Sequence, residues 1–273
     1  MRNLSLVNLI SIIFLRDFNI AKSYKIRFLF SIFYVFFQIL IFYFLTAFIT
    51  DQENSILSNK NLFVFFAIGI CFLDISQLLI SYASRQLEEF KVSGLYEEIL
   101  SLPISGSIYH LCSNVYPLLF AFYRYCLYLF FINLFIEDLN LSINSFAMLF
   151  FIFIIFMISN IGLSLISISI TIAFHKSAFF SSLFGVFAAL FGGVFFSAQT
   201  LPDTIQFLSL ILPIQTALDL SRGILNTDLI NMSNFYEKII ILSGYAFFYI
   251  FIGLIILNLA IKYNKISSQT SNF

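Results

Sequence analysis

Charged residues are scarce in this sequence: lysine, arginine, aspartate and glutamate make up 10% of its 273 residues, and apolar residues make up 60%. Soluble domains carry roughly 25% charged residues, so this composition excludes an ordinary soluble domain and is typical of a membrane protein. The 14 basic residues equal the 14 acidic ones in number. This balance excludes the basic surface of a nucleic-acid-binding protein, so we predict no nucleic-acid partner.

Residues that carry catalytic or metal chemistry are also few. The three cysteines lie in apolar runs without metal-ligand spacing, and we interpret Cys71, Cys112 and Cys126 as packing residues. No carboxylate pair, Ser/His/Asp set or Cys/His cluster has the spacing of a catalytic site, which disfavours a membrane enzyme. The sequence has no G-x-x-x-x-G-K-[ST] phosphate-binding loop. We therefore predict no catalytic residue, no metal site and no cofactor bound by this chain.

Long apolar runs dominate the rest of the sequence. Each run offers about 20 or more apolar residues, enough to cross a hydrocarbon core of about 30 Å as a helix. The predicted fold is an all-α integral membrane protein with six spans, at about 28–50, 61–83, 107–135, 145–173, 178–197 and 239–261. Residues 1–25 have apolar positions at helical spacing among charges, which predicts an amphipathic helix at the membrane interface. We expect a single domain over 1–273, with this helix, a 28–261 bundle and a 262–273 tail.

The basic residues predict the orientation of the spans. With both termini in the cytoplasm, ten basic residues lie inside and only Lys60, Arg222 and Lys238 lie outside. Cytoplasmic loops carry an excess of Lys and Arg, so we expect a multi-pass protein of the plasma (inner) membrane with cytoplasmic termini. The 84–106 loop is then cytoplasmic, and the 198–238 segment is external.

Polar and small residues line single faces of four predicted spans, which is typical of buried or path-lining faces. Charge deep in a span is costly, so we expect Asp74 and Arg124 to pair; the alternative is that they line a translocation path. Ser181, Gly185, Ala189 and Gly193 recur every four residues and predict close helix packing. The polar candidates for the path are Asp74, Gln77, Asn114, Arg124, Tyr128 and Asn160.

The loop after the second predicted span contains a glycine, a short acidic segment and a proline. It reads EFKVSGLYEEILSLPIS over residues 89–105, and the glycine and proline bracket about two and a half helical turns. This pattern resembles the coupling helix of type-2 ATP-binding-cassette (ABC) export permeases, which seats in a groove of the ATPase subunit. The resemblance covers Gly94, Tyr96, Glu97, Glu98, Leu100, Pro103 and Ser105. It implies that Tyr96, Glu97, Glu98 and Leu100 contact that ATPase.

The stretch from Gly192 to Leu225 is too polar to span a bilayer and too apolar for an ordinary loop. It resembles the re-entrant outer hairpin that precedes the last span in the same family. The resemblance implies an outer gate, with Pro202 and Pro213 at its bends. The residues concerned are Gly193, Leu201, Pro202, Pro213, Asp219 and Arg222, and the last two are candidates for an ion pair within the subunit or across a dimer.

The resemblance implies a permease subunit of an ATP-driven exporter. Two ABC ATPase subunits would bind ATP and Mg, and a second copy of the chain or a related permease would complete the path. The family's substrates include lipid-linked, polysaccharide and drug-like molecules. Its polysaccharide exporters often line their channel with aromatic residues. The tyrosines of this sequence could serve that role, but tyrosines also anchor spans at the interface. The alternative function is an ion-coupled secondary transporter or channel that uses Asp74 and Arg124.

Overall fold

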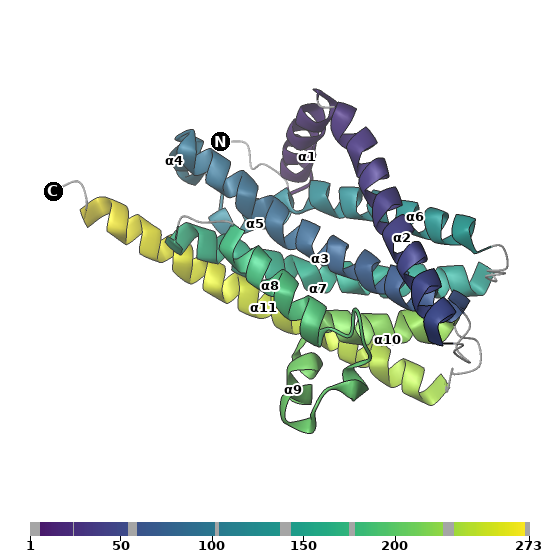
Figure 1. Cartoon of the computed structure of the whole chain (residues 1–273). Coiled ribbons are helices and arrows are strands. Elements are labelled where there is room, and N and C mark those ends of the chain that lie inside the picture. The colour runs from purple at the N-terminus through teal and green to yellow at the C-terminus, as the bar shows by residue number, and fades with distance from the viewer. Residues whose placement is uncertain are drawn as a thin grey trace.

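The computed structural model describes residues 6–23, 25–53, 59–101, 104–136, 143–174, 178–225 and 232–270. This part of the chain is helical and contains no strand (Figure 1). Its elements are α1 (Leu6–Ser23), α2 (Lys25–Glu53), α3 (Asn59–Val92), α4 (Leu95–Ser101), α5 (Gly106–Ser113), α6 (Val115–Phe135), α7 (Ile143–Phe174), α8 (Ala178–Phe191), the 3-10 turn η1 (Ala198–Thr200), α9 (Asp203–Ile211), α10 (Pro213–Leu225) and α11 (Met232–Thr270).

Five of the six predicted spans are helices long and apolar enough to cross a membrane. They are Lys25–Thr50, Asn61–Val92, Gly106–Phe135, Ile143–Phe174 and Phe235–Asn264. The third is interrupted at Asn114, where α5 gives way to α6. The predicted all-α membrane fold is therefore confirmed.

The predicted span at 178–197 has different bounds. Its helix, α8, has 14 residues and ends at Phe191, so it is about 21 Å long and shorter than a hydrocarbon core. Gly193 ends the run because its φ of 75° lies in the left-handed region that favours glycine. The apolar composition of 192–197 concealed this break. After it, the chain forms the 3-10 turn η1 and regains α-helical structure in α9 and α10.

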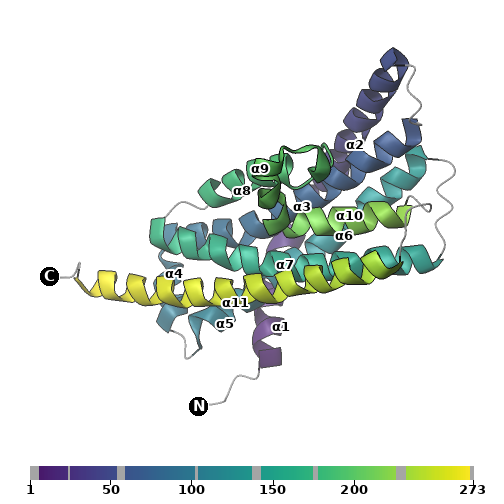
Figure 2. The same ribbon diagram turned by 90° about the horizontal axis from the view of Figure 1, so that it is seen from below.

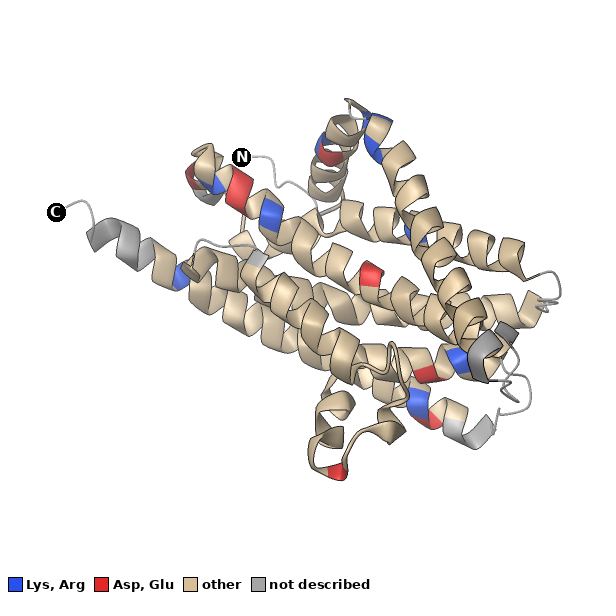
Figure 3. Ribbon diagram, viewed as in Figure 1, with Lys and Arg blue, Asp and Glu red and all other residues tan. Residues whose placement is uncertain are grey.

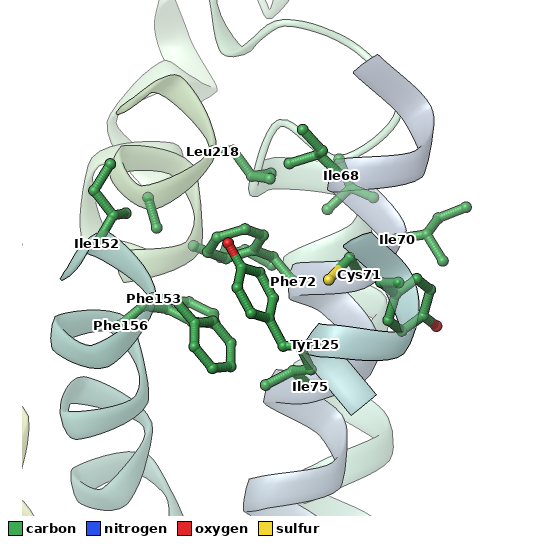
Figure 4. Packing of buried hydrophobic residues seen from close by; sticks show 14 of the residues in the cluster. Ile68, Ile70, Cys71, Phe72, Ile75, Tyr125, Ile152, Phe153, Phe156 and Leu218 are labelled. Carbon is green, nitrogen blue, oxygen red and sulfur yellow. The ribbon is translucent and has the colours of Figure 1, made fainter. Parts of the chain in front are cut away.

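The middle of the bundle is formed by α3 and α7. The apolar windows of these two helices are 67% and 61% buried, against 17% for α2 and for α11. Aromatic rings fill the space between α3, α6 and α7 (Figure 4). The ring centroids of Tyr125 and Phe153 are 3.8 Å apart in a stacked arrangement, and those of Phe72 and Phe156 are 4.8 Å apart. This packed core fixes the positions of the helices around it.

Two small residues let α7 and α11 approach closely. A Cβ on Gly162 would lie 2.3 Å from the backbone of Tyr249, and one on Gly253 would lie 2.7 Å from the carbonyl oxygen of Gly162. Real Cβ atoms do not come so near to backbone atoms, so both positions require glycine. The long α11, which leaves much of its own surface exposed, is held to the central α7 at this crossing.

The bundle has two ends that differ in their elements. The helix α4 and the end of α11 lie at one end, called here the α4 end, and the end of α2 and the start of α3 lie at the opposite end (Figure 1). Charged residues gather near the two ends, with few between them (Figure 3). This distribution is what a bilayer around the middle of the bundle requires.

The N-terminal helix α1 is packed against the bundle at the α4 end. Leu9 and Ile13 are buried in a small cluster with Tyr109 and Cys112. Asp17 is 1% exposed; it forms an ion pair with Arg16 at 2.8 Å and accepts a hydrogen bond from Gln86 at 3.0 Å. The amphipathic pattern of residues 1–25 thus serves protein packing as well as any interface.

Candidate functional site

The turn from α3 to α4 is built on a glycine. Gly94 has a φ of 77°, and the amides of Ser93 and Gly94 donate to the carbonyl oxygens of Glu89 and Lys91 at 3.0 and 3.3 Å. These bonds close the last turn of α3, and the left-handed glycine reverses the chain into α4. The seven-residue α4 is about two turns long. Gly94 and Pro103 were predicted to bracket this helix. Gly94 directly precedes α4, as predicted, and Pro103 lies outside the described residues.

The two acidic residues of α4 face outward. Glu97 and Glu98 are exposed and lie in the first turn, where the N-terminal end of a helix favours negative charge. Ser105, which precedes α5, is exposed as well. The side chain of Leu100 lies outside the described part. The exposed surface of this segment therefore combines an acidic pair with apolar side chains, since Val92 is 85% and Leu95 is 45% exposed.

Tyr96 differs from its prediction as a docking side chain. It is 4% exposed and packs with Leu87, Ile172 and Leu257, from α3, α7 and α11. Burial raises the pKa of its phenol to about 12. The side chain is therefore uncharged and packs between helices of the bundle. Helical spacing alone could not show which face of so short a helix turns inward.

Lys91 joins α3 to the end of α7. Its Nζ donates to the carbonyl oxygens of Thr171 and Ile172 at 3.2 and 2.9 Å and lies 5.6 Å from the centre of the Tyr96 ring. Carbonyl groups in the last turn of a helix have no partner within the helix, so a cation is favourable there. The base of α4 is thus tied to α7 by a contact that sequence reasoning missed.

The hairpin between α8 and α11 consists of η1, α9 and α10. Pro202 immediately precedes α9, Pro213 begins α10, and the two helices meet at an angle of 89°. Proline suits these positions because the first residues of a helix lack internal partners for their amides. Leu201 ends η1. In Figures 1 and 2, α9 projects from the side of the bundle beside α8 and α10.

Two tyrosines of α11 bind the bend of this hairpin. Their hydroxyl groups donate to the last carbonyls of α9, Tyr245 to Leu210 and Tyr249 to Ile211, the latter at 2.6 Å. Tyr245 and Tyr249 lie about 15 and 21 Å along α11 from Phe235, where its apolar span begins. The hairpin therefore reaches about the middle of that span, as a re-entrant segment would.

Arg222 connects α10 to the break after α8. Its guanidinium donates to the carbonyl oxygens of Gly193 at 2.6 Å, Phe65 at 2.9 Å and Val194 at 3.0 Å, and it lies 3.4 Å from the centre of the Phe65 ring. The planar guanidinium can serve several acceptors at once. A Cβ on Gly69 would lie 2.5 Å from the Val194 carbonyl oxygen, so α3 also needs glycine at this contact.

Within the subunit, Asp219 and Arg222 make two separate interactions instead of the candidate pair. Asp219 forms an ion pair with Lys238 of α11 at 3.0 Å, while Arg222 is bound by backbone carbonyls. Residues three apart on a helix are neighbours, but the carbonyls exposed by the Gly193 break compete successfully for the guanidinium. Backbone acceptors leave no mark in a sequence.

Asp74 and Arg124 form the expected pair. Arg124 Nη2 lies 3.1 Å from Asp74 Oδ2, and both side chains are nearly buried. The guanidinium lies 4.6 Å from the centre of the Tyr34 ring. Tyr128 donates to Gln38 Oε1, and Gln38 Nε2 donates to the Tyr34 hydroxyl at 2.9 Å. Together these residues form a polar cluster that links α2, α3 and α6.

The other polar candidates make contacts of their own outside this cluster. Asn114 accepts a hydrogen bond from Ser164 at 2.7 Å and so ties the α5–α6 break to α7. Asn160 is fully buried and donates to the carbonyl oxygen of Phe156 at 2.8 Å. Gln77 is exposed beside Gly185, whose Cβ position lies 2.0 Å from its amide nitrogen. The contacts of Asn114, Asn160 and Gln77 are thus separate from those of the Asp74–Arg124 pair.

A comparison with protein families decides the identity of the fold. Residues 8–226 match the model of the ABC-2 type transporter. The chain belongs to the ABC-2 type transporter family. It is thus the permease subunit of an ABC transporter and a multi-pass membrane protein. No curated protein gives a significant match to it.

The family match extends from α1 to the end of α10, so it contains both α4 and the hairpin. It favours an ABC permease over the ion-coupled secondary transporter. In this permease the Asp74–Arg124 pair has the contacts expected of a structural element, because both charges are compensated by residues of neighbouring helices.

Proposed function

We propose that this permease is half of an ATP-driven exporter whose ATPase subunits dock on α4. The observation that carries the proposal is the construction of α4, a short helix with an exposed acidic face and a buried base. Glu97 and Glu98 are available to a partner. Tyr96 packs the helix against α3, α7 and α11 and contacts Lys91 of α3, which binds the end of α7. A load applied to α4 would therefore move these helices together.

The nucleotide would be bound by other chains of the complex. Two ABC ATPase subunits would bind ATP and Mg, and each would contact the α4 of one permease, with a second copy or a related permease as the other half. Closure of the ATPase pair would move the two α4 segments as rigid bodies. The cargo would leave through the space between the permeases, past the hairpins, which would act as outer gates.

The proposed orientation places the α4 end in the cytoplasm of the cell and the hairpin toward the outside. Basic residues support it, because Arg16, Arg27, Arg85 and Lys91 lie on helices at the α4 end, as does Lys262 near the end of α11. The far end has fewer: Lys238 and Arg222 are already bound by Asp219 and by carbonyls. Transport out of the cytoplasm is the direction that this placement of the gate favours.

The docking role is tested by reversing charge on α4. Glu97→Lys combined with Glu98→Lys removes the acidic face without touching the core, since both residues are exposed. We expect loss of copurification with the ABC ATPase subunit and loss of permease-stimulated ATP hydrolysis. Glu237→Lys, an exposed glutamate of α11 near the opposite end, is the control and should change neither. Unchanged copurification and hydrolysis in the double variant would show that α4 is not the docking site.

A further inference from the structure

A polar hollow lies within the hairpin, between η1, α9 and α10. Its volume is about 460 Å³, within the range of about 300–1,000 Å³ that is typical of small-molecule sites. Side chains from all three elements line it, among them Gln199, Asp203, Gln206, Phe207, Gln215 and Asp219. This polar lining is unusual for a chain that is 60% apolar.

Three amides give the hollow its hydrogen-bonding character. In the part of the chain that the structure describes, the side chains of Gln199, Gln206 and Gln215 make no hydrogen bond to protein. Each amide offers an acceptor oxygen and two donor hydrogens. Amides from three separate elements around one hollow can therefore bind a ligand that both donates and accepts, as a hydroxyl group does.

The charges of the hollow are compensated, which argues against a charged ligand. Asp219 is paired with Lys238 at 3.0 Å. Asp203 lies in the first turn of the nine-residue α9, where the N-terminal end of the helix stabilises a carboxylate. The neighbouring cation, Arg222, is bound by three carbonyls. An anionic group such as a phosphate would meet two carboxylates without a free cation.

An exposed aromatic ring completes the lining. Phe207 is 56% exposed on α9, next in sequence to Gln206. Sugars present C–H groups on the faces of their rings and hydroxyl groups at the edges, so they suit an aromatic face beside amide and carboxylate groups. A wholly apolar cargo would leave the amides without partners, which is unfavourable in a desolvated site.

We propose that this hollow is a binding subsite for a neutral, hydroxyl-rich segment of the cargo, that is, for part of a glycan. The inference rests on the proposed export function and names the class of its substrate. The amides of Gln199, Gln206 and Gln215 bind the hydroxyl groups, Asp203 and Asp219 accept from further hydroxyl groups, and Phe207 contacts a sugar face. Because the hollow belongs to the hairpin, it binds the cargo at the proposed gate.

The experiment measures the binding of soluble probes to the purified permease in lipid nanodiscs that contain no glycoside detergent. The probes are maltoheptaose and chitotetraose as neutral glycans, inositol hexaphosphate as an anion, tetraphenylphosphonium as an apolar cation and a neutral Ser/Gly/Asn peptide. We expect a neutral glycan to bind, and the Gln199→Ala/Gln206→Ala/Gln215→Ala variant to weaken its affinity at least tenfold. Thr204→Ala, an exposed residue of α9 that does not line the hollow, should bind as the wild type does.

Three results would overturn the proposal: no neutral glycan binds the wild type, the triple variant binds it equally well, or the anion, the cation or the peptide competes for the same glutamines. Docking of the ATPase on α4 separates the two ideas. If the Glu97/Glu98 variant abolishes docking but no glycan binds, only the substrate class is wrong. If a glycan binds through the glutamines and no ATPase docks on α4, the subsite stands and the coupling role of α4 is wrong.

Discussion

Arg222 provides the sharpest test of how the hairpin is held. Its guanidinium makes three hydrogen bonds to the carbonyls of Gly193, Phe65 and Val194, and a hydrogen bond to a charged group contributes about 1.5–3 kcal/mol. Such contributions do not add fully, so Arg222→Ala should lower the free energy of unfolding by about 3–5 kcal/mol. At about 2–4 °C per kcal/mol for a domain of this size, the melting temperature should fall by roughly 10 °C.

The protein carries its own reporters for this measurement. Cys71 and Cys112 are free and buried, whereas Cys126 is partly exposed. In a Cys126→Ser background, a thiol-reactive fluorescent dye therefore labels the protein only as the bundle opens. Arg222→Lys should fall between the wild type and Arg222→Ala, because a compact ammonium cannot reach all three acceptors. Arg85→Ala removes an exposed arginine and should leave the melting temperature within about 1 °C. If Arg222→Ala also melts within about 1 °C of the wild type, the carbonyl contacts do not hold the hairpin.

Three further perturbations test other contacts. Gly162→Ala should destabilise the fold by about 1–3 kcal/mol because its Cβ would meet the backbone of Tyr249, whereas Gly244→Ala, with open space around it, should be neutral or slightly stabilising in the same melts. Asp74→Ala and Arg124→Ala should each cost about 3–5 kcal/mol, and the double variant should cost less than their sum, since each single change strands a charge of the pair. Burial raises the pKa of the Asp17 carboxyl, and the nearby Arg16 opposes this effect only in part. Asp17 therefore binds a proton more readily when α1 is docked than when it is free, so the docking of α1 should weaken as the pH rises through the raised pKa. Asp17→Asn should remove this pH dependence of stability in melts run from about pH 4 to 7. A pH-independent wild type would contradict the last expectation.

The spans and the α4 turn could be predicted because their signals are local. Apolar runs of span length and the left-handed glycine at Gly94 act within a few residues of the feature that they create. The Asp74–Arg124 pair was also predictable, because two lone charges in apolar spans have few other partners.

The contacts that escaped prediction join residues far apart in the sequence through backbone atoms. Lys91 binds carbonyls of Thr171 and Ile172, and Arg222 binds the carbonyl of Phe65. A carbonyl is present at every position, so the sequence does not show which one is the partner. The close crossing at Gly162 was missed for a related reason, since its partner surface is the backbone of α11.

The inward face of Tyr96 and the end of α8 were misjudged because composition does not record direction. A seven-residue helix presents each face only twice, so burial of Tyr96 depends on how α3 and α7 are placed. In the same way, residues 192–197 are apolar enough to continue a span, but the φ of Gly193 and the carbonyls that Arg222 binds turn the chain aside.

These contacts form a continuous route between the two candidate sites. Tyr96 packs α4 against α7 and against Lys91 of α3, which binds the end of α7. The crossing at Gly162 holds α7 against α11, and Tyr249 of α11 binds the end of α9. Every step is a packed or hydrogen-bonded contact between helices, and packed interfaces transmit displacement instead of absorbing it. In the proposed mechanism, a shift of α4 that carried α7 would also carry α11 and pull on the bend between α9 and α10 through Tyr249.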